Sequence, residues 1–236
     1  MRISIMQPYF LPYIGYIQLL AASDVFVVYD DVNFINRGWI NRNNLLLNGA
    51  PHRFTIPLVK ASQNKKINEI GISGDEKWRD KLLRTIEAAY KKAPHFQKTF
   101  SWLQTVLTYP EKNLGGYVAH SLEAITQYLE LPARIVPSST IYQNQALKAG
   151  DRLMDVCKQE GAEVYINPSG GQELYTKEQF ASQEVNLQFL IPKAVAYPQA
   201  GVDKFVPWLS ILDALMNCTP EEIRSNLLST NAYELI

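Results

Sequence analysis

One stretch of the chain, residues 30–43, gathers side chains that could recognise a polar ligand. It holds two carboxylates, two guanidinium groups, four amides and an indole. Arg37 and Arg42 offer planar forks that suit a phosphate or a carboxylate. Trp39 could stack on a base or a sugar, and Asn41 adds an amide. A solvated loop rarely concentrates so many recognition groups, so the stretch predicts contact with a ligand.

Asp30 and Asp31, at the start of this stretch, are the first candidates for catalysis. They follow the apolar run Val25–Tyr29, where one carboxylate could hold a sugar hydroxyl or act as a general base. Because side chains alternate along a strand, we expect the two to point to opposite sides and to form no paired-carboxylate device. Adjacent acids are also common as solvated turn residues, and the sequence leaves that alternative open.

Histidine and cysteine chemistry has little support. No two of the three histidines have metal-ligand spacing on a helix, and we expect neither a metal nor another cofactor. His95 follows Ala93-Pro94 at a predicted helix start and is the isolated candidate for a base. Cys157 and Cys218 are too few for a disulfide framework or a zinc cluster, and they indicate free thiols in a reducing cytoplasm.

Polar residues and glycines also follow the other predicted strands. In open parallel sheets, ligands bind outside the carboxyl ends of the strands, so we expect these segments to meet in one polar pocket. A Ser-Gly-Gly turn would let a phosphate approach the backbone closely. Such a pocket suits a neutral polyol or a nucleotide. Its further candidate residues are Gln7, Tyr9, Tyr16, Ser169, Gly170, Tyr197 and Gln199.

The first thirty residues have the pattern of a strand–helix–strand unit. Arg2–Met6 has the pattern of a short strand, which must end before Pro8 because proline lacks an amide hydrogen. A helix is predicted over 14–21. Val25–Tyr29 is apolar at every position, which is typical of a strand covered on both faces. The two strands should be parallel, with a right-handed crossover.

A hairpin and three helices then interrupt the alternation of strand and helix. Asn48-Gly49 is a strong signal for a tight turn, and strands are predicted at 42–47 and 53–58 on either side of it. Apolar stripes at helical spacing predict the three helices, with Asp75 as the cap of the first. These stripes run over residues 78–90, 96–107 and 114–129.

Strands and helices alternate again from residue 134. The predicted fold is α/β: a mainly parallel, Rossmann-like sheet flanked by helices, with a β-hairpin and a helical insertion over about 75–131. No linker or repeat divides the chain, so we expect one domain over residues 1–236. The later strands are predicted at 134–137, 163–166 and 185–191, and the later helices at 151–160, 177–182, 209–216 and from Thr219 onward.

Composition excludes several classes of protein. The chain has 236 residues with 23 basic and 23 acidic side chains, and 47% of it is hydrophobic, which is typical of a folded globular protein. Zero net charge argues against binding to duplex nucleic acid or an anionic membrane. Residues 3–23 are uncharged, but Pro8, Pro12 and Gln18 interrupt them. We therefore expect no signal peptide and no membrane span, and a cytoplasmic protein.

Several segments, spread over nearly the whole chain, carry a family resemblance: Met6–Tyr16, Val25–Val32, Arg37–Asn43, Ala93–Phe96, Asp151–Leu153, Gly161–Tyr165, Tyr197–Gln199 and Leu209–Asp213. They resemble the WbqC-like family. The resemblance implies a bacterial protein associated with O-antigen or other surface-polysaccharide biosynthesis. It also implies Ser-Gly directly after a strand, whereas Asn167-Pro168 separates Ser169 from the strand predicted at 163–166.

A second resemblance is confined to the first strand–helix unit. The unit is similar to that of nucleotidyltransferases with two histidines around a glycine, but here those positions are Tyr13 and Tyr16. A phenol is neutral at pH 7 and does not replace an imidazolium against a developing phosphate charge. We therefore expect a shared architecture without that chemistry.

The family context and the residues favour one function and leave two alternatives. The favoured function is a transferase that modifies a nucleotide-activated amino sugar by N-acyl or aminoacyl transfer. Its partners would be the nucleotide-linked sugar and an acyl or aminoacyl donor, and a homo-oligomer is compatible with the sequence. One alternative is a nucleotidyl or adenylyl transferase with tyrosines in place of histidines. The other is a non-catalytic module that binds a nucleotide sugar.

In the favoured transferase, the candidate residues would have separate roles. Arg37 and Arg42 would hold the phosphates, while Asp30 or Asp31 would bind hydroxyls or accept the amine proton. The sugar would be oriented by Gln7, Tyr9 and Gln199. Bringing the amine and the donor together can by itself supply much of the rate of such a step.

Overall fold

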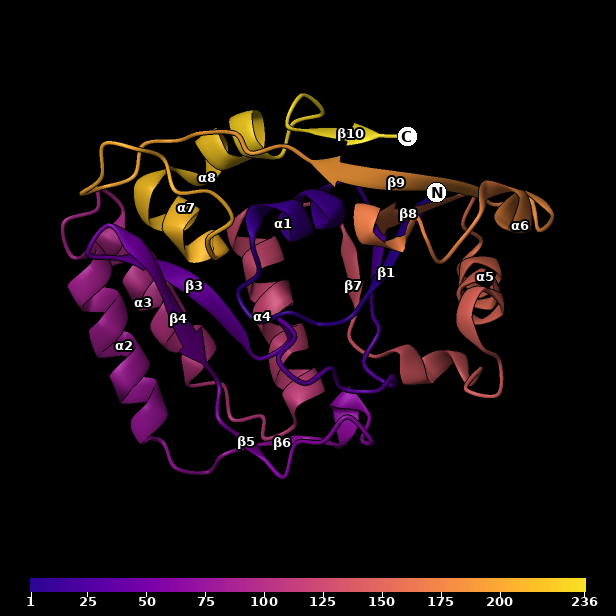
Figure 1. Ribbon diagram of the computed structural model, residues 1–236, viewed down its shortest axis with the longest axis horizontal. Helices are drawn as coiled ribbons and strands as arrows, with labels where there is room; N and C mark the ends of the chain where they lie inside the picture. Colours follow the sequence, from indigo (N-terminus) through magenta and orange to yellow (C-terminus); the bar gives the residue numbers. More distant parts are fainter.

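The computed structural model describes all of residues 1–236. Short apolar strands form a central sheet (Figure 1). Its six strands lie in the order β10 (Tyr233–Leu235), β9 (Asn186–Pro192), β8 (Val164–Pro168), β1 (Arg2–Met6), β2 (Val25–Val28) and β7 (Arg134–Val136). All neighbours pair in parallel except β10, which is antiparallel to β9. The predicted α/β class with a mainly parallel sheet is confirmed.

The predicted strand–helix–strand unit is present at the amino terminus. Helix α1 (Ile14–Ala21) connects β1 to β2, and the two strands pair in parallel from Ile3 opposite Val25 to Met6 opposite Val28. Every residue of β2 is buried, as expected of a strand covered on both faces. Tyr13 is the N-cap residue that precedes α1.

The chain reverses its direction of travel across the sheet at β1. β2 and β7 lie on one side of β1, and α5 (Ala149–Glu160) then carries the chain over to β8 and β9 on the other side. The point where the strand order reverses is therefore between β1 and β8. In open α/β sheets, the carboxyl ends of the two strands at such a point form a crevice that commonly binds ligands.

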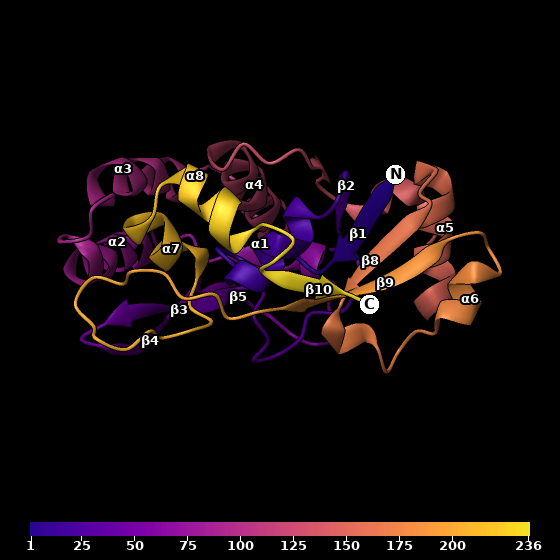
Figure 2. The same ribbon diagram turned by 90° about the horizontal axis from the view of Figure 1, so that it is seen from above.

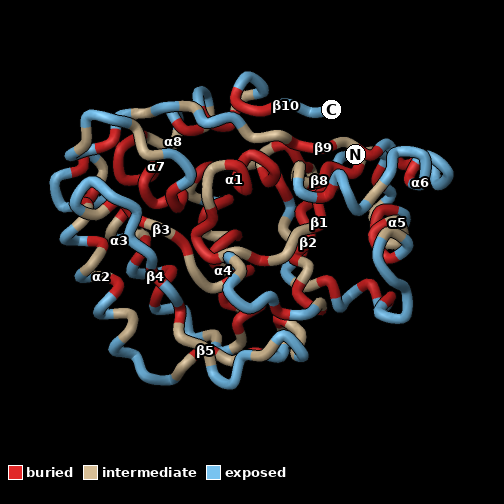
Figure 3. The backbone as a smooth tube through the Cα atoms, viewed as in Figure 1, coloured by how far each residue is buried: buried red, intermediate tan, exposed pale blue.

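Helices cover both faces of the sheet and define two hydrophobic cores. Figure 2 shows α1 and α4 (Leu114–Tyr128) on one face and α5 and α6 (Lys177–Ala181) on the other. The core beneath α1 and α4 extends into the inserted helices, and the smaller core lies beneath α5 and α6. The backbone of β1, β2 and α1 is mostly buried, whereas the peripheral loops are exposed (Figure 3).

The insertion between β2 and β7 contains the predicted hairpin and helices. β3 (Arg42–Leu47) pairs with β4 (Ala50–Thr55) around a two-residue turn, Asn48-Gly49, in which both residues have positive φ. The second strand was predicted at 53–58, but it begins at residue 50 because the turn uses only two residues. The first two helices are α2 (Lys77–Tyr90) and α3 (Phe96–Leu107).

Local differences from the sequence-based prediction lie at the ends of elements. Asp75 accepts the Lys77 amide at 3.1 Å, yet α2 is capped at Glu76. β8 extends to Pro168, so Ser169 follows the strand directly, as the family resemblance implies. The edge strand β10 was not predicted.

The remaining elements are β5 (Leu58–Val59), β6 (Gly71–Ile72), α7 (Ile211–Asn217), α8 (Pro220–Glu222), the turns η1 (Ile67–Glu69), η2 (Ser139–Tyr142) and η3 (Ser169–Gly171), and the π-helical η4 (Ile223–Leu227).

Two further expectations concern single features of the chain. Cys157 and Cys218 are free and buried, which agrees with the prediction of unpaired thiols. Thr219 begins α8 with a reciprocal capping box to Glu222, as the Thr-Pro-Glu-Glu sequence indicates. No helix combines the length and the apolarity that crossing a membrane requires.

Candidate functional site

A cavity of about 670 Å³ lies at the point where the strand order reverses. Met6 and Gln7 line it from the end of β1, and Asn167 lines it from the end of β8. The first turn of α1, the 35–43 segment and the η3 turn complete the walls. Its volume is in the range of ordinary small-molecule sites, and its place is the one that the sheet topology favours for a ligand.

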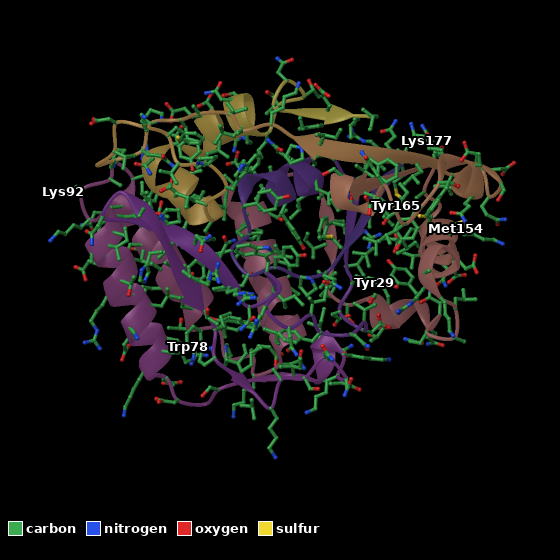
Figure 4. The ribbon with its side chains drawn as sticks, viewed as in Figure 1. Tyr29, Trp78, Lys92, Met154, Tyr165 and Lys177 are labelled. Carbon is green, nitrogen blue, oxygen red and sulfur yellow. The ribbon has the colours of Figure 1, made fainter.

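The cavity lining is aromatic and electrically neutral. No acidic, basic or histidine side chain lines it. Burial raises the pKa of each tyrosine in the wall, so the phenols stay neutral at ordinary pH. Figure 4 shows two of them, Tyr29 and Tyr165, on the side of the central strands that faces Met154 of α5. The wall tyrosines are Tyr9, Tyr13, Tyr16, Tyr29, Tyr165 and Tyr175.

Large apolar side chains are exposed at the edge of the cavity. Ile35, Trp39, Leu174 and Trp208 are all among its lining residues, and each is exposed by 44% or more. Trp208 also has a φ of +62°, a conformation that bulky residues rarely adopt. Exposed aromatic surface and backbone strain of this kind tend to occur at binding sites, so we treat this edge as the mouth of the site.

A group of three arginines without acidic partners includes one beside Trp39, and none of the three lines the cavity itself. The Arg53 guanidinium is 5.7 Å from the centre of the Trp39 ring, and Arg42 Nε donates to the Gly38 carbonyl at 2.6 Å. Partial burial lowers the pKa of Arg42, and the like charges of Arg53 and Arg37 lower it further. None of the three is in an ion pair. A bound anion would relieve their mutual repulsion.

The η3 turn forms one wall of the cavity with its backbone. The Gln172 amide donates to the Ser169 carbonyl at 3.2 Å and closes the turn. A Cβ on Gly171 would lie 2.1 Å from Asn167 Nδ2, so glycine is needed where the Asn167 side chain rests on the turn. Gly170 has no atom within 4 Å of a Cβ position.

Asp30 and Asp31 lie outside the cavity, in contact with other segments. Asp30 Oδ1 accepts from Ser138 Oγ at 2.8 Å and from the Ser139 amide at 3.1 Å. Asp31 forms an ion pair with Arg152 and accepts from the Ser139 hydroxyl. Because both acids touch Ser139, the alternation expected from a strand does not continue past Val28.

The two carboxyls differ in their electrostatics. Burial raises the pKa of Asp30 despite the hydrogen bonds from Ser138 and Ser139. Burial also acts to raise the pKa of Asp31, but the bonds from Ser139 and Arg152 outweigh it, and that pKa lies below its usual value. The Arg152 guanidinium is also 4.8 Å from the ring of Tyr29, which lines the cavity. Asp31 thereby supports the cavity wall through Arg152.

Tyr197 and Gln199 also lie outside the cavity, around a buried carboxylate of α7. Asp213 Oδ2 accepts from Tyr197 Oη and from Gln199 Nε2, both at 2.7 Å. Asp213 Oδ1 accepts from Tyr90 Oη at 2.9 Å. Burial raises the pKa of Asp213 in spite of these three donors. Tyr197 and Gln199 are therefore tied to α7 and lie outside the cavity, whereas Trp208 of the same segment lines it.

Three more predicted residues, which are Arg37, Asn41 and His95, do not line the cavity. The exposed Arg37 belongs to the arginine group, while Asn41 Nδ2 donates to the Ile56 carbonyl at 2.8 Å outside the cavity wall. His95 occupies the N-cap position of α3 without a side-chain capping bond, and its amide donates to the Met216 carbonyl at 3.0 Å. The cavity brings together six of the predicted residues: Gln7, Tyr9, Tyr16, Trp39, Ser169 and Gly170.

Comparison with known proteins identifies the family. The model of the WbqC-like protein family matches residues 7–225. The chain belongs to the WbqC-like protein family. A relative of this WbqC-like protein is the uncharacterized protein Rv1507c of Mycobacterium tuberculosis (strain H37Rv), with 28% identity over 222 residues, which cover 93% of this chain and 95% of the relative. No solved structure matches.

Two features of this WbqC-like protein bear on the resemblance to nucleotidyltransferases. Tyr16, at one of the two histidine positions, is 2% exposed, and its hydroxyl donates to the Gln7 carbonyl at 2.9 Å. Tyr13, at the other, is the residue that precedes α1 and packs against Trp208. The Tyr16 hydroxyl is thus already bonded to the backbone and holds the end of β1 against α1.

Among the residues of this site that sequence reasoning missed, three matter most to the proposed function. Asn167 was treated as part of a connecting segment, because the strand was predicted to end at Ile166. Arg53 lies in a hairpin strand, where a single arginine gives no signal until its neighbours in space are known. Trp208 has no sequence signal beyond its type. Proline can occur in a strand where its missing amide hydrogen is not needed for pairing. A predicted strand extended to Pro168 would have placed Asn167 at the end of β8.

Proposed function

We propose that this protein is a transferase that adds an acyl or aminoacyl group to the amine of a nucleotide-activated sugar, for bacterial surface-polysaccharide biosynthesis. One observation carries the proposal: the cavity is neutral and aromatic, and a group of arginines without acidic partners lies outside its lining, beside the lining residue Trp39. A nucleotide sugar has the matching division, because its sugar is uncharged or weakly charged and its diphosphate is anionic. The polysaccharide context comes from the family resemblance.

The proposed ligand orientation follows from this division of charge. The sugar lies in the cavity, against the ring of Trp39 and the side chains of Gln7 and Tyr9. The diphosphate lies at the mouth, where Arg37 and Arg42 hold it with help from Arg53. Guanidinium forks suit phosphate oxygens in this way, and an aromatic wall with a few polar groups is typical of small-molecule sites.

The neutral wall also suits the proposed chemistry. An ammonium group that enters an uncharged, partly desolvated cavity loses hydration without gaining a counter-charge, so its pKa falls and the free amine becomes more available. The free amine attacks the acyl carbon of an activated donor. A C–N bond forms as the bond from that carbon to the donor's sulfur or oxygen breaks, and the amine proton leaves with that atom. Proximity of the two groups supplies much of the rate.

The catalytic roles of Asp30, Asp31 and His95 stay predictions, and the same holds for the sugar contacts of Tyr197 and Gln199. A direct role for Asp30 requires the wall to open towards Ser138, because its carboxyl is 3% exposed and bonded there. Activity of an Asp30→Asn variant decides the matter. Loss of turnover with unchanged sugar-nucleotide affinity would assign Asp30 to the chemical step.

The test of the function is a search for product. The purified protein is incubated with nucleotide-linked amino sugars, in pairs with acyl thioesters or aminoacyl esters, and the sugars are analysed by mass spectrometry. We expect one pair to give a mass gain equal to the acyl group, and a Trp39→Ala variant to lose most of it. If no pair gives a gain, the transferase proposal is wrong.

A second function, a non-catalytic module that binds a nucleotide sugar, is favoured by a specific observation. No residue that lines the cavity can exchange a proton near neutral pH. Isothermal titration separates the two functions when it is combined with the product search. Tight binding of a nucleotide sugar with no turnover for any donor would support the module.

A further inference from the structure

The cavity holds two buried asparagines, and only one of them is bonded within the protein. Asn43 Nδ2 donates to the Leu11 carbonyl at 2.9 Å, and its Oδ1 accepts the Asn44 amide at 2.8 Å. Asn167 is as deeply buried, at 5% exposure against 4% for Asn43. Its Nδ2, however, is enclosed without an acceptor. Buried polar groups are nearly always hydrogen-bonded, so the Asn167 amide lacks a partner in the unliganded protein, and Asn167 is also one of the residues that line the cavity.

The surroundings of Asn167 keep its carboxamide in place. It stands on β8 beside β1, where the strand order reverses, and its Nδ2 rests against the α-carbon of Gly171. A side chain at position 171 would occupy the same space, with its Cβ 2.1 Å from Nδ2. The glycine thus lets the carboxamide pack against the η3 turn. A group fixed in this way recognises a ligand at little cost in conformational entropy.

The chemistry of a carboxamide defines its ligand partner. It offers an acceptor oxygen and donor hydrogens in one plane, so its best complement is a planar edge with a C=O beside an N–H. We propose that Asn167 recognises such an amide edge on the bound ligand and so determines specificity, an inference that rests on the proposed function. Either the N-acylamino group of a sugar or the imide edge of a uracil or thymine base supplies this edge.

The sugar is the source that the site favours. Asn167 lies in the inner wall, at the strand ends, whereas the arginines that suit the diphosphate lie beside Trp39 at the mouth. A ligand with its phosphates at the mouth places its sugar inward. An N-acylamino group is also what the proposed transfer creates, so Asn167 would distinguish the acylated sugar from its precursor.

The experiment is a set of calorimetric titrations on the full chain. The probes are an N-acetylamino sugar and the corresponding hexose, each linked to uridine diphosphate and to thymidine diphosphate, with UDP and ADP alone as base controls. The variants are Asn167→Leu, which keeps the size, and Asn167→Asp, which keeps the shape but lacks the donors. Asn64→Leu, the same change at an exposed loop position, is the matched control, and thermal melts check folding.

We expect the wild-type protein to bind the acetylamino sugar about tenfold more tightly than the hexose, a difference that one or two neutral hydrogen bonds supply. Asn167→Leu and Asn167→Asp should reduce that preference to within about twofold, and Asn64→Leu should keep it. If both variants instead weaken UDP but not ADP, with the sugar preference unchanged, the amide edge belongs to the base and the recognition still stands.

Two results would overturn the inference, and they differ in what else they remove. If both Asn167 variants keep the sugar preference and the affinity for UDP, Asn167 has no recognition role, while the proposed function is untouched. If the wild-type protein binds none of the nucleotide sugars, the proposed function fails and the inference fails with it.

Discussion

Two sets of polar groups in this protein differ in whether the protein itself satisfies them. Around Asp31 and Asp213, every carboxylate oxygen has a donor from elsewhere in the chain. In and around the cavity, the Asn167 amide has no acceptor, and the arginine group beside Trp39 has no acid. Satisfied groups hold segments together, whereas an unsatisfied group in the wall of a cavity is a candidate for contact with a ligand.

This difference shows why residue type alone is a poor guide to the site. The carboxylates of Asp30 and Asp31 were the obvious catalytic candidates, and the structure gives them partners in the segments after β7. Asn167 is an unremarkable residue type, and its significance comes from the absence of a partner. Substitutions in the satisfied set should mainly lower stability, and substitutions in the unsatisfied set should mainly weaken ligand binding.

The largest expected effect is at the ion pair. Asp31→Leu leaves Arg152, which is 5% exposed, as an uncompensated buried charge, and should cost about 3–5 kcal/mol in the free energy of unfolding. Urea denaturation measures this loss. The Asp31→Leu/Arg152→Met double variant should recover most of it, because no charge is then left unpaired. A loss below about 1 kcal/mol for the single variant would contradict a structural role for this pair.

A smaller loss of stability is expected at the η3 turn. Gly171→Ala places a methyl group against Asn167 Nδ2 and should cost about 2 kcal/mol by overpacking. Gly170→Ala is the matched control, since no atom lies within 4 Å of its Cβ position, and it should change stability by less than about 0.5 kcal/mol. Equal losses in the two variants would show that Asn167 does not pack against Gly171.

The Asp213 group should respond more mildly. Tyr197→Phe removes one of three donors to this carboxylate and should cost about 1.5 kcal/mol, as expected for a hydrogen bond to a charged group. Thermal or urea unfolding measures it. Tyr109→Phe, at a partly exposed tyrosine, should have little effect. If Tyr197→Phe leaves stability unchanged but removes ligand binding, Tyr197 belongs to the site after all.

The pH dependence of stability should separate Asp31 from the cavity. The folded-state pKa of Asp31 lies below its usual value, so its contribution is present above pH ~4 and is lost as the pH falls through the lowered pKa. Unfolding curves between pH 6 and 2.5 should therefore be less steep with pH in the Asp31→Leu/Arg152→Met variant than in the wild-type protein. Identical profiles would show that Asp31 does not gain its charge stabilisation from folding.

The smallest effect is expected at the arginine group. Arg42→Gln should leave stability nearly unchanged and weaken nucleotide-sugar binding about three- to tenfold at low salt, since one of three cations facing the phosphates is lost. The loss should shrink as salt is added, because salt screens these exposed charges. Calorimetry at two ionic strengths measures it. An equal loss at both would contradict an electrostatic role.

The sequence predicted local structure where residues such as proline and glycine give strong signals for the ends of helices and strands. Pro8 and the charge-free run to Ser23 define β1 and α1, and Asn48-Gly49 defines the hairpin turn, because these signals act between near neighbours. Whether β8 or β7 lies beside β1 depends on contacts between distant segments, and no local pattern encodes it. The strand predicted at 163–166 ended too early. It was stopped before Pro168, although a proline at the last position of a strand is compatible with pairing on one side.

The candidate site was predicted in part, for the same reason. Gln7 and Ser169 reached the cavity because each directly follows a strand of the parallel sheet, and Tyr9 lies two residues beyond Gln7. Asp31 did not, because its partner Arg152 is 121 residues away, and pairing over that distance leaves no local signal. Tyr197 follows β9, but the segment leaves the sheet edge to bond with Asp213.

The most direct test of the central claim is a crystal structure of the protein with a bound nucleotide-linked acylamino sugar. We expect the sugar inside the cavity, between Trp39 and Asn167, with the diphosphate oxygens within hydrogen-bonding distance of at least two of Arg37, Arg42 and Arg53. A sugar seated beside Asp30 and Asp31 or beside Asp213, with the cavity empty, would contradict it.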